Sequence, residues 1–329
     1  MRILVAGGAG FVGSHLCRRL VDDGHDVTCI DSLITGSRSN IGDLLGHPRF
    51  TFIETDVEKA PAVPVELIYH LASPASPVDY DLYPLETLSV NSRGTWRLLD
   101  IARTVGARLL YASTSEIYGD PLIHPQPETY WGNVDPVGPR SCYDEGKRFG
   151  EALVTSYRRI HQVPTKIVRI FNTYGPAMRA DDGRVIPELM SAALDGRPMR
   201  LHGDGSQTRS FMFVSDLVEA FVRIGLHPGM DGDIVNIGNP SEVTMRELAE
   251  LIRDLVAPGV ELEYIPARPG DPQRRKPNIG RIRERYGWEP RVSLEEGLRI
   301  TEAWFRESRV VPAGPRHQVD RLVPVLRSP

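Results

Sequence analysis

Long apolar runs, cysteine and excess positive charge are all scarce or absent in this chain of 329 residues. No apolar run reaches the roughly 18 residues of a membrane span, so we expect no transmembrane helix. Cys17, Cys29 and Cys142 are far apart and lack the spacing of metal ligands, so we predict reduced thiols, no metal site and a cytoplasmic location. A formal net charge of −4 makes nucleic acid and anionic membranes unexpected partners. A strand pattern follows Met1 directly, so no signal peptide is expected.

Lysine is also scarce, because only four of the 39 basic residues are lysine and the rest are arginine. One of the four, Lys147, follows Tyr143 by four residues, and such positions share one face of a helix. An ammonium beside a phenol stabilises the phenolate and should lower the phenol pKa from about 10. The pair could then accept a proton from a sugar or alcohol hydroxyl. The alternative is a surface pair on an amphipathic helix, which so short a motif does not exclude.

Short apolar runs alternate with helical stretches over the first two-thirds of the chain. Continuous apolar strands separated by helices indicate a parallel sheet that is covered on both faces. We therefore predict an α/β fold with a doubly wound parallel Rossmann sheet. The expected helices are 11–23, 83–105 and 143–161, and the expected strands are 2–6, 26–30, 50–54, 67–71, 108–112 and 166–170.

The pattern changes after residue 172, where proline and glycine recur. Helices are expected at 184–195 and 244–256, and strands at 211–214 and 233–237, the last of which could return to the main sheet. We predict a smaller, interleaved α/β domain for the substrate. The predicted division assigns 1–172, with 209–237, to the cofactor domain, 173–208 and 238–309 to the substrate domain, and 310–329 to a tail.

A glycine-rich turn follows the first expected strand and opens the first expected helix. Gly7, Gly10 and Gly13 are spaced so that the backbone can approach a pyrophosphate at the helix N-terminus, and Phe11 and Val12 lie in the same turn. Asp31 ends the second strand, where a carboxylate binds a ribose 2′-hydroxyl and repels a 2′-phosphate, so we predict NAD. Arg38 is a further candidate, although it could serve NAD or NADP. A glycine-rich helix start without a cofactor is the alternative.

Three more segments are candidates for contact with the cofactor. Leu71, Ala72 and Ser73 end the fourth strand, at the carboxyl edge where ligands bind in such sheets. Asp56 and Val57 follow the third strand and could flank the adenine, or they could form an ordinary loop. Asn91 could contact the cofactor or serve as an internal polar residue of a helix.

Long segments of the chain resemble the extended short-chain dehydrogenase/reductase family of nucleotide-sugar enzymes. The resemblance is carried by residues 70–77, 112–120, 138–148 and 203–211, and it covers roughly residues 1–306. Within the family these segments look like the branch that decarboxylates a UDP-linked uronic acid. The resemblance implies a UDP-sugar substrate and NAD-dependent conversion of UDP-glucuronate to UDP-xylose. It also implies a homodimer formed through two helices, here near 85–105 and 145–161.

The same resemblance assigns roles to individual residues. Tyr143 and Lys147 would form the catalytic pair, and Thr114 would supply the hydroxyl beside it. Glu116 stands without the adjacent aspartate that the 4,6-dehydratases carry, whereas 4-epimerases usually lack an acid here. Arg275 would lie near the substrate carboxylate. The nucleotide would be bound by Asn172, Arg184, Val185, Arg209, Arg268 and Asp271, with the arginines neutralising the diphosphate.

The main interpretation is decarboxylation followed by return of the hydride to the sugar, but the sequence leaves other functions open. They are a 4-epimerase, a 4,6-dehydratase, an enzyme that releases the UDP-4-keto-pentose, and a non-enzymatic NAD-sensing regulator. Three features depart from the family pattern. Asp79 replaces a common histidine, Ser32 and Leu33 replace the asparagine and aromatic residue that usually follow Asp31, and the proline-rich tail is unfamiliar in the family.

Overall fold

The computed structural model describes residues 1–267 and 274–310, and its centre is a seven-stranded sheet in which all neighbouring strands are parallel. The strand order is β11-β6-β5-β4-β1-β2-β3. The order of the chain reverses at β1, which pairs with β2 on one side and with β4 on the other. The strands are β1 (Arg2–Ala6), β2 (Asp26–Asp31), β3 (Phe50–Glu54), β4 (Leu67–His70), β5 (Arg108–Thr114), β6 (Thr165–Ile170) and β11 (Ile234–Ile237).

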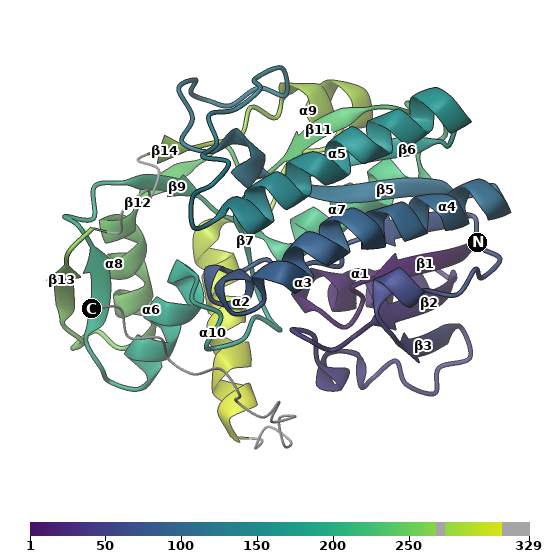
Figure 1. The fold of residues 1–329 in the computed structure, drawn as a ribbon. Helices are drawn as coiled ribbons and strands as arrows, with labels where there is room; N and C mark the ends of the chain where they lie inside the picture. The colour runs from purple at the N-terminus through teal and green to yellow at the C-terminus, as the bar shows by residue number, and fades with distance from the viewer. Residues whose placement is uncertain (268–273, 311–329) are drawn as a thin grey trace, which may run out of the picture.

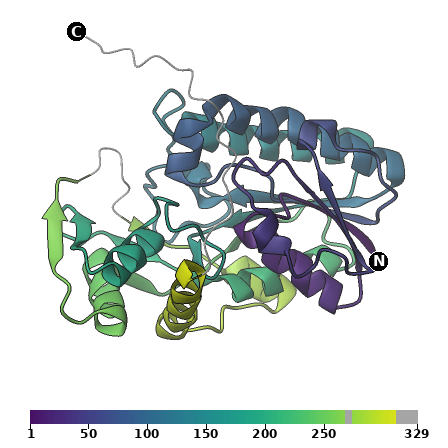
Figure 2. The same cartoon turned by 90° about the horizontal axis from the view of Figure 1, so that it is seen from below.

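Two helical layers cover the sheet, as Figures 1 and 2 show from two directions. Helices α1 (Phe11–Asp22) and α7 (Val214–Leu226) pack together on one face. The other face carries α3 (Pro84–Ser89), a π-helical turn (Val90–Gly94), α4 (Thr95–Val105) and α5 (Ser141–His161). A separate apolar cluster fills the space under each layer. The prediction of a doubly wound α/β sheet is therefore confirmed.

The remaining elements form a smaller unit beside the carboxyl ends of the strands (Figure 1). Its helix α8 begins with a capping box, in which Thr244 and Glu247 satisfy each other's backbone N–H groups. Its helices are α6 (Val185–Leu194), α8 (Met245–Val256) and α10 (Leu294–Val310). Its short strands pair as β7 (Thr173–Tyr174) with β10 (Met212–Phe213), β8 (Met199–His202) with β13 (Leu262–Ile265), and β9 (Thr208–Ser210) with β12 (Glu242–Thr244) and β14 (Arg274–Arg275).

Several short helices complete the structure. They are α2 (Pro77–Leu82), α9 (Gly280–Tyr286) and the 3₁₀ helices η1 (Arg38–Ile41), η2 (Val57–Lys59) and η4 (Ser115–Tyr118). Within residues 1–267 and 274–310, no helix is both long and apolar enough to span a membrane. The predicted tail at 310–329 lies outside the described residues, apart from the last residue of α10.

Two predicted elements differ from the structure. The helix expected at 83–105 is three segments, because the π turn at Val90–Gly94 interrupts the α-helical bonding. The strand expected at 211–214 is only Met212–Phe213, and the helix α7 begins at once behind it. Strand β11 pairs with β6 at the edge of the large sheet, so the expected strand at 233–237 does return to it.

Candidate active site

The glycine-rich turn joins β1 to α1 at the point where the strand order reverses. Gly7 has φ +83°, and a Cβ there would lie 2.7 Å from the Ala72 backbone nitrogen. A Cβ on Gly13 would overlap the Gly7 carbonyl oxygen. These glycines let the first turn of α1 approach β1 and β4 closely, and the helix directs its free N–H groups toward the pocket.

Asp31 ends β2 beside this turn and is buried. Its carboxylate accepts hydrogen bonds from the backbone N–H of Ala9 (3.0 Å) and of Leu33 (2.8 Å). Burial raises the pKa of Asp31, although the two backbone donors oppose that shift. The hydrogen bonds fix the carboxylate at the rim of the pocket, where a ribose would lie.

A pocket runs from the glycine turn along the carboxyl ends of β1, β2 and β4. Asp56, in the wall of this pocket, caps η2 by accepting from Glu58 N at 2.8 Å. Eleven of the predicted cofactor residues line the pocket: Gly7, Gly10, Phe11, Val12, Gly13, Asp31, Asp56, Val57, Leu71, Ala72 and Ser73.

Four predicted cofactor residues do not line this pocket: Arg38, Asn91, Tyr143 and Lys147. Arg38 is paired with Glu54 and lies over the ring of Phe52, with its guanidinium carbon 5.0 Å from the ring centroid. Asn91 is fully buried in the π turn and donates to the Ser73 hydroxyl (2.9 Å) and to the Thr87 carbonyl (2.8 Å). Asn91 therefore holds Ser73, a residue of the pocket wall, in place.

Tyr143 and Lys147 lie on the first turns of α5, and both side chains are buried. The Lys147 ammonium donates to the Ala112 carbonyl at 2.9 Å and lies 5.8 Å from the centroid of the Tyr143 ring. The Tyr143 ring stacks on Tyr80 at a centroid distance of 5.4 Å, and its hydroxyl is hydrogen-bonded to Thr114. The structure thus brings Tyr143, Lys147 and Thr114 together at the end of β5.

The expected direction of the Tyr143 pKa is wrong for this arrangement. Burial raises the pKa of Tyr143, and the hydrogen bond from Thr114 only partly opposes it. Burial also lowers the pKa of Lys147 to about 7, against the attraction of the Glu151 carboxylate. The spacing of the pair correctly predicts that the two side chains lie together. However, loss of water around both groups shifts their pKa values more than the attraction between ammonium and phenolate does.

Glu116 and Arg275, which are 159 positions apart in the chain, form a buried ion pair. Glu116 lies on η4, just after Thr114, and Arg275 lies on β14, with only 4% of its side chain exposed. Arg140 pairs with the other oxygen of the same carboxylate. Burial alone would raise the pKa of Glu116, but attraction to Arg275 and Arg140 outweighs it and lowers that pKa.

A second pocket lies beside the first, between β9, α6 and α8. Arg184 lines both pockets and therefore lies where they meet. Strands β14 and β9 place Arg275 in register with Arg209, so two predicted anion-binding residues are neighbours. Asn172, Val185 and Arg209, which were predicted to bind the nucleotide, also line the second pocket, whereas Arg268 and Asp271 lie outside the described residues.

One set of polar contacts in the wall of the cofactor pocket was not predicted from the sequence. Arg179 donates to the Asp79 carboxylate at 2.6 Å and to the Thr35 carbonyl at 3.4 Å, and all three residues line that pocket. The only signal in the sequence was that Asp79 departs from the family pattern. Arg140, the second partner of Glu116, was missed as well.

The parallel sheet, the glycine turn at its switch point and the buried tyrosine–lysine pair define a dinucleotide-dependent enzyme of the oxidoreductase type. The chain matches the NAD dependent epimerase/dehydratase family over residues 3–238. It belongs to that family, whose cofactor is NAD. The glycine cradle and Asp31 fit this cofactor, since the N-terminus of α1 can take the pyrophosphate and the carboxylate can take a ribose hydroxyl.

Individual relatives agree with this assignment. UDP-glucuronic acid decarboxylase 3 of Arabidopsis thaliana is 50% identical over 313 residues, covering 95% of this chain and 91% of that protein. Among solved structures, UDP-glucose 4-epimerase of Thermotoga maritima has a TM-score of 0.86 and 28% identity, covering 94% of this chain and 100% of that one. UDP-glucuronic acid 4-epimerase of Bacillus cereus, in complex with UDP-glucuronic acid and NAD, has a TM-score of 0.85 and 26% identity, with coverages of 94% and 100%.

Proposed function

We propose that this protein is a UDP-glucuronate decarboxylase that forms UDP-xylose and regenerates its NAD in each turnover. The observation that carries the proposal is the Glu116–Arg275 ion pair, which lies beside Thr114 and Tyr143 and includes a buried guanidinium suited to a carboxylate. The 50% identity to a UDP-glucuronic acid decarboxylase along nearly the whole chain supports the same activity.

The first step is removal of the proton from the C4 hydroxyl of the sugar. Bound NAD supplies the hydride acceptor for C4 and later the hydride donor. Tyr143 accepts the hydroxyl proton in its phenolate form and becomes a phenol, and Thr114, hydrogen-bonded to the Tyr143 hydroxyl, orders the path from the sugar hydroxyl to Tyr143. Lys147, fixed by the Ala112 carbonyl, places positive charge beside the phenolate before this transfer.

The second step is loss of carbon dioxide from the 4-keto sugar. The carboxylate on C5 is then β to the ketone, so the electrons of the breaking C–C bond pass into an enolate at C4. Tyr143, now protonated, and Thr114 can donate hydrogen bonds to that oxygen. Arg275 orients the carboxylate before it leaves, and Glu116 holds Arg275 in the required direction. A proton from water adds at C5, hydride returns to C4, and Tyr143 returns its proton to the C4 oxygen, which together give the xylose product.

The acidic residues near Thr114 argue against dehydratase activity. Glu116 is preceded by Ser115 rather than by an aspartate, so the pair of acids that the family's dehydratases carry is missing. An epimerase is a weaker candidate than a decarboxylase, because the epimerases of similar fold are only 26–28% identical to this chain.

The direct test is incubation of the purified protein with UDP-glucuronate, first without added cofactor and then with NAD⁺. We expect a UDP-pentose that has lost the mass of carbon dioxide and shows the proton couplings of xylose by NMR. Tyr143→Phe is the inactive control. A UDP-4-keto-pentose together with NADH would limit the activity to oxidative decarboxylation. An unchanged mass with galacturonate couplings would show a 4-epimerase instead.

We further propose that the chain forms a homodimer through α3, α4 and α5. Large apolar side chains are exposed on these helices, including Leu85 (74%), Trp96 (51%), Phe149 (47%) and Ile160 (72%). Helix α5 packs against both α3 and α4, so the three helices that carry these side chains are neighbours. Light scattering should give twice the chain mass, and Phe149→Glu should give one chain mass. A wild-type monomer would refute the proposal.

We also propose that the two parts of the chain divide the ligands between them. The large sheet would hold NAD, and residues 173–208 with 238–309 would hold most of the UDP portion. Arg184 and Arg209, which line the second pocket, support this division by offering positive charge to a diphosphate. UDP alone should therefore protect the smaller part from hydrogen exchange more than the large sheet.

A further inference from the structure

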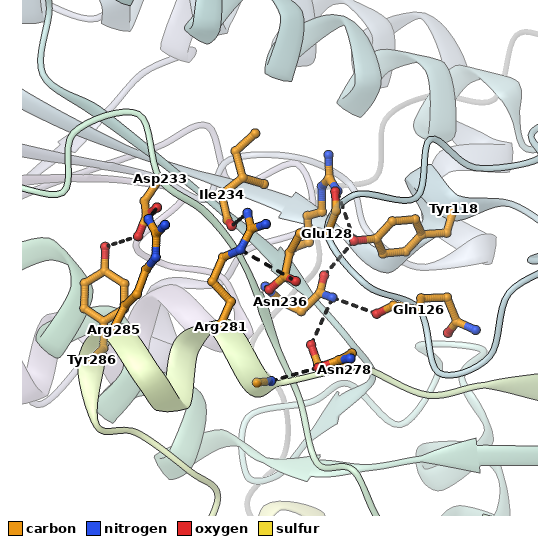
Figure 3. Close-up of polar contacts among 12 residues, drawn as sticks. Tyr118, Gln126, Glu128, Asp233, Ile234, Asn236, Asn278, Arg281, Arg285 and Tyr286 are labelled. Atoms are coloured by element: carbon orange, nitrogen blue, oxygen red, sulfur yellow. Dashed lines mark hydrogen bonds and ion pairs between the residues drawn. The ribbon is translucent and has the colours of Figure 1, made fainter.

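Asn236 lies on the edge strand β11 and is fully buried, with its side-chain amide at the centre of a polar network (Figure 3). Its Oδ1 accepts a hydrogen bond from the Tyr118 hydroxyl at 2.8 Å. Its Nδ2 donates to the backbone carbonyls of Gln126 (2.9 Å) and Asn278 (3.2 Å). One side chain therefore joins three segments that are far apart in the sequence.

Gln126, which is also fully buried, holds the segment that carries Arg275. Its backbone N–H donates to the Lys276 carbonyl at 2.9 Å, and its Oε1 accepts from the Lys276 N–H at 2.9 Å. Its carbonyl accepts from the Asn278 N–H at 3.0 Å. These bonds attach the residue after Arg275 to the loop that follows η4.

The opposite end of the network reaches the helix that carries Glu116. Tyr118, two residues after Glu116, accepts a hydrogen bond from Arg169 at 3.0 Å as well as donating to Asn236. Arg169 in turn forms a two-pronged ion pair with Glu151, through contacts of 2.9 and 2.7 Å. Glu151 lies one turn after Lys147 on α5. The buried polar chain thus anchors the Glu116 side of the site to the same framework as Lys147.

Strand β14 needs such an anchor because it is only two residues long and has β9 as its one strand partner among the described residues. Hydrogen bonds of the Asn236 amide to the buried Gln126 carbonyl and the partly buried Asn278 carbonyl fix both the loop and the returning chain, and an unpaired buried carbonyl there would be costly. A guanidinium must lie within about 0.5 Å of its productive position to bind a carboxylate well.

We infer that Asn236 and Gln126 are positioning residues that set Arg275 against Glu116, and that they thereby determine preference for a sugar nucleotide that carries a carboxylate. This inference rests on the proposed function. Both act through the segment that carries Arg275: Gln126 is hydrogen-bonded to Lys276, and Asn236 is hydrogen-bonded to the carbonyls of Gln126 and Asn278.

The test compares two ligands that differ in the carboxylate. UDP-glucuronate uses the nucleotide pocket and Arg275, whereas UDP uses the nucleotide pocket alone. For Asn236→Ala we expect the Kd of UDP-glucuronate to rise roughly 10- to 100-fold, as for a misplaced binding group, while the Kd of UDP changes less than about twofold. Gln126→Met, which removes the acceptor for Lys276 N–H and the donor to the Ile123 carbonyl, should give a smaller change in the same direction.

The matched control is Tyr286→Phe, which removes a buried hydrogen bond to Asp233, the residue before β11. It should lower the melting temperature without changing the ratio of the two affinities. The inference would be overturned if the Asn236 and Gln126 variants bound UDP and UDP-glucuronate equally more weakly. It would also be overturned if Tyr286→Phe changed the ratio of the two Kd values. An unchanged ratio in a folded Asn236→Ala would do the same.

Different results would refute the inference and the proposed function. A wild-type enzyme that does not decarboxylate UDP-glucuronate refutes the proposed function. A wild-type enzyme that does so, with Asn236 and Gln126 variants that keep the wild-type ratio of affinities, refutes only the positioning role. If Asn236→Ala does not fold, Gln126→Met decides between the outcomes.

Discussion

Replacement of Asp144 by asparagine should make the protein more stable, and more so at alkaline than at acidic pH. Asp144 follows Tyr143 on α5 and is buried, with a relative exposure of 7%. Within the described residues, its Oδ1 has no hydrogen-bond partner. Burial raises the pKa of Asp144 to about 7, repulsion from Glu116 adds to the shift, and Arg140 and Arg275 partly oppose it.

The sign follows from proton linkage. Well below a pH of about 4 the carboxyl is protonated in both the folded and the unfolded chain, so its titration costs no stability. As the pH rises through the unfolded pKa of about 3.9 toward the folded pKa, the unfolded chain ionises first and is favoured. The cost is complete above the folded pKa of about 7.

The magnitude follows from the same two pKa values. At about 1.36 kcal/mol per pKa unit, the cost is about 1–2 kcal/mol at pH 5 and about 4 kcal/mol at pH 8. An asparagine side chain at this position would carry no such cost, so the gain from Asp144→Asn should be about 2–3 kcal/mol larger at pH 8 than at pH 5. With an unfolding entropy of about 2.1 cal/mol/K per residue, this corresponds to roughly 4 °C in melting temperature.

The assay is thermal unfolding of the wild type and of Asp144→Asn in buffers from pH 5 to pH 8. Glu145→Gln is the matched control, because it removes the adjacent carboxylate, which is partly exposed and pairs with Arg148 at 3.3 Å. We expect no comparable gain for that variant at either pH. A difference between Asp144→Asn and wild type that stays constant with pH, or that shrinks as pH rises, would refute the reasoning.

Three further predictions concern the cofactor, the chemistry and the core. Tyr143→Phe should lower kcat by about 10²- to 10⁴-fold in steady-state assays, while calorimetry shows unchanged binding of UDP. Asp79→Asn should loosen Arg179 over the cofactor pocket, so that less NAD is recovered by acid extraction after gel filtration and the Kd of added NAD⁺ rises several-fold; equal recovery would contradict this role. Leu248→Ala, at a fully buried position of α8, should lower the unfolding free energy by about 2–5 kcal/mol in denaturant titrations, with kcat at low temperature unchanged.

The sequence predicted the large sheet well because its strands are buried on both faces. Such strands are continuous apolar runs, and the run at Leu67–His70 is buried at every position. Helix α7 was missed because Phe211–Val214 is also a short apolar run, and such a run does not distinguish a strand from a buried helix start. The π turn was missed because nothing in local spacing marks one extra residue within a helical pattern.

In the candidate site, features set by local spacing were predicted, whereas contacts between distant residues were not. The glycine turn and the Tyr143–Lys147 pair depend on spacing within one segment, so the sequence places them correctly. The Arg179–Asp79 pair joins residues 100 positions apart, and no local pattern could predict it. The pKa of Tyr143 was predicted in the wrong direction, because spacing shows which groups meet but not how much water they lose.

The late position of β11 constrains how the chain can fold as it is synthesised. Strand β6 ends at Ile170, but its outer neighbour β11 begins only at Ile234, after α6 and β8 have been made. A nascent chain therefore cannot close the cofactor sheet until α6 and β9, which line the nucleotide pocket, have left the ribosome. Until then β6 presents an unpaired edge, which can pair with other chains. A gene fragment that ends at residue 172 would keep that edge permanently, so the cofactor-binding part should aggregate when it is expressed alone.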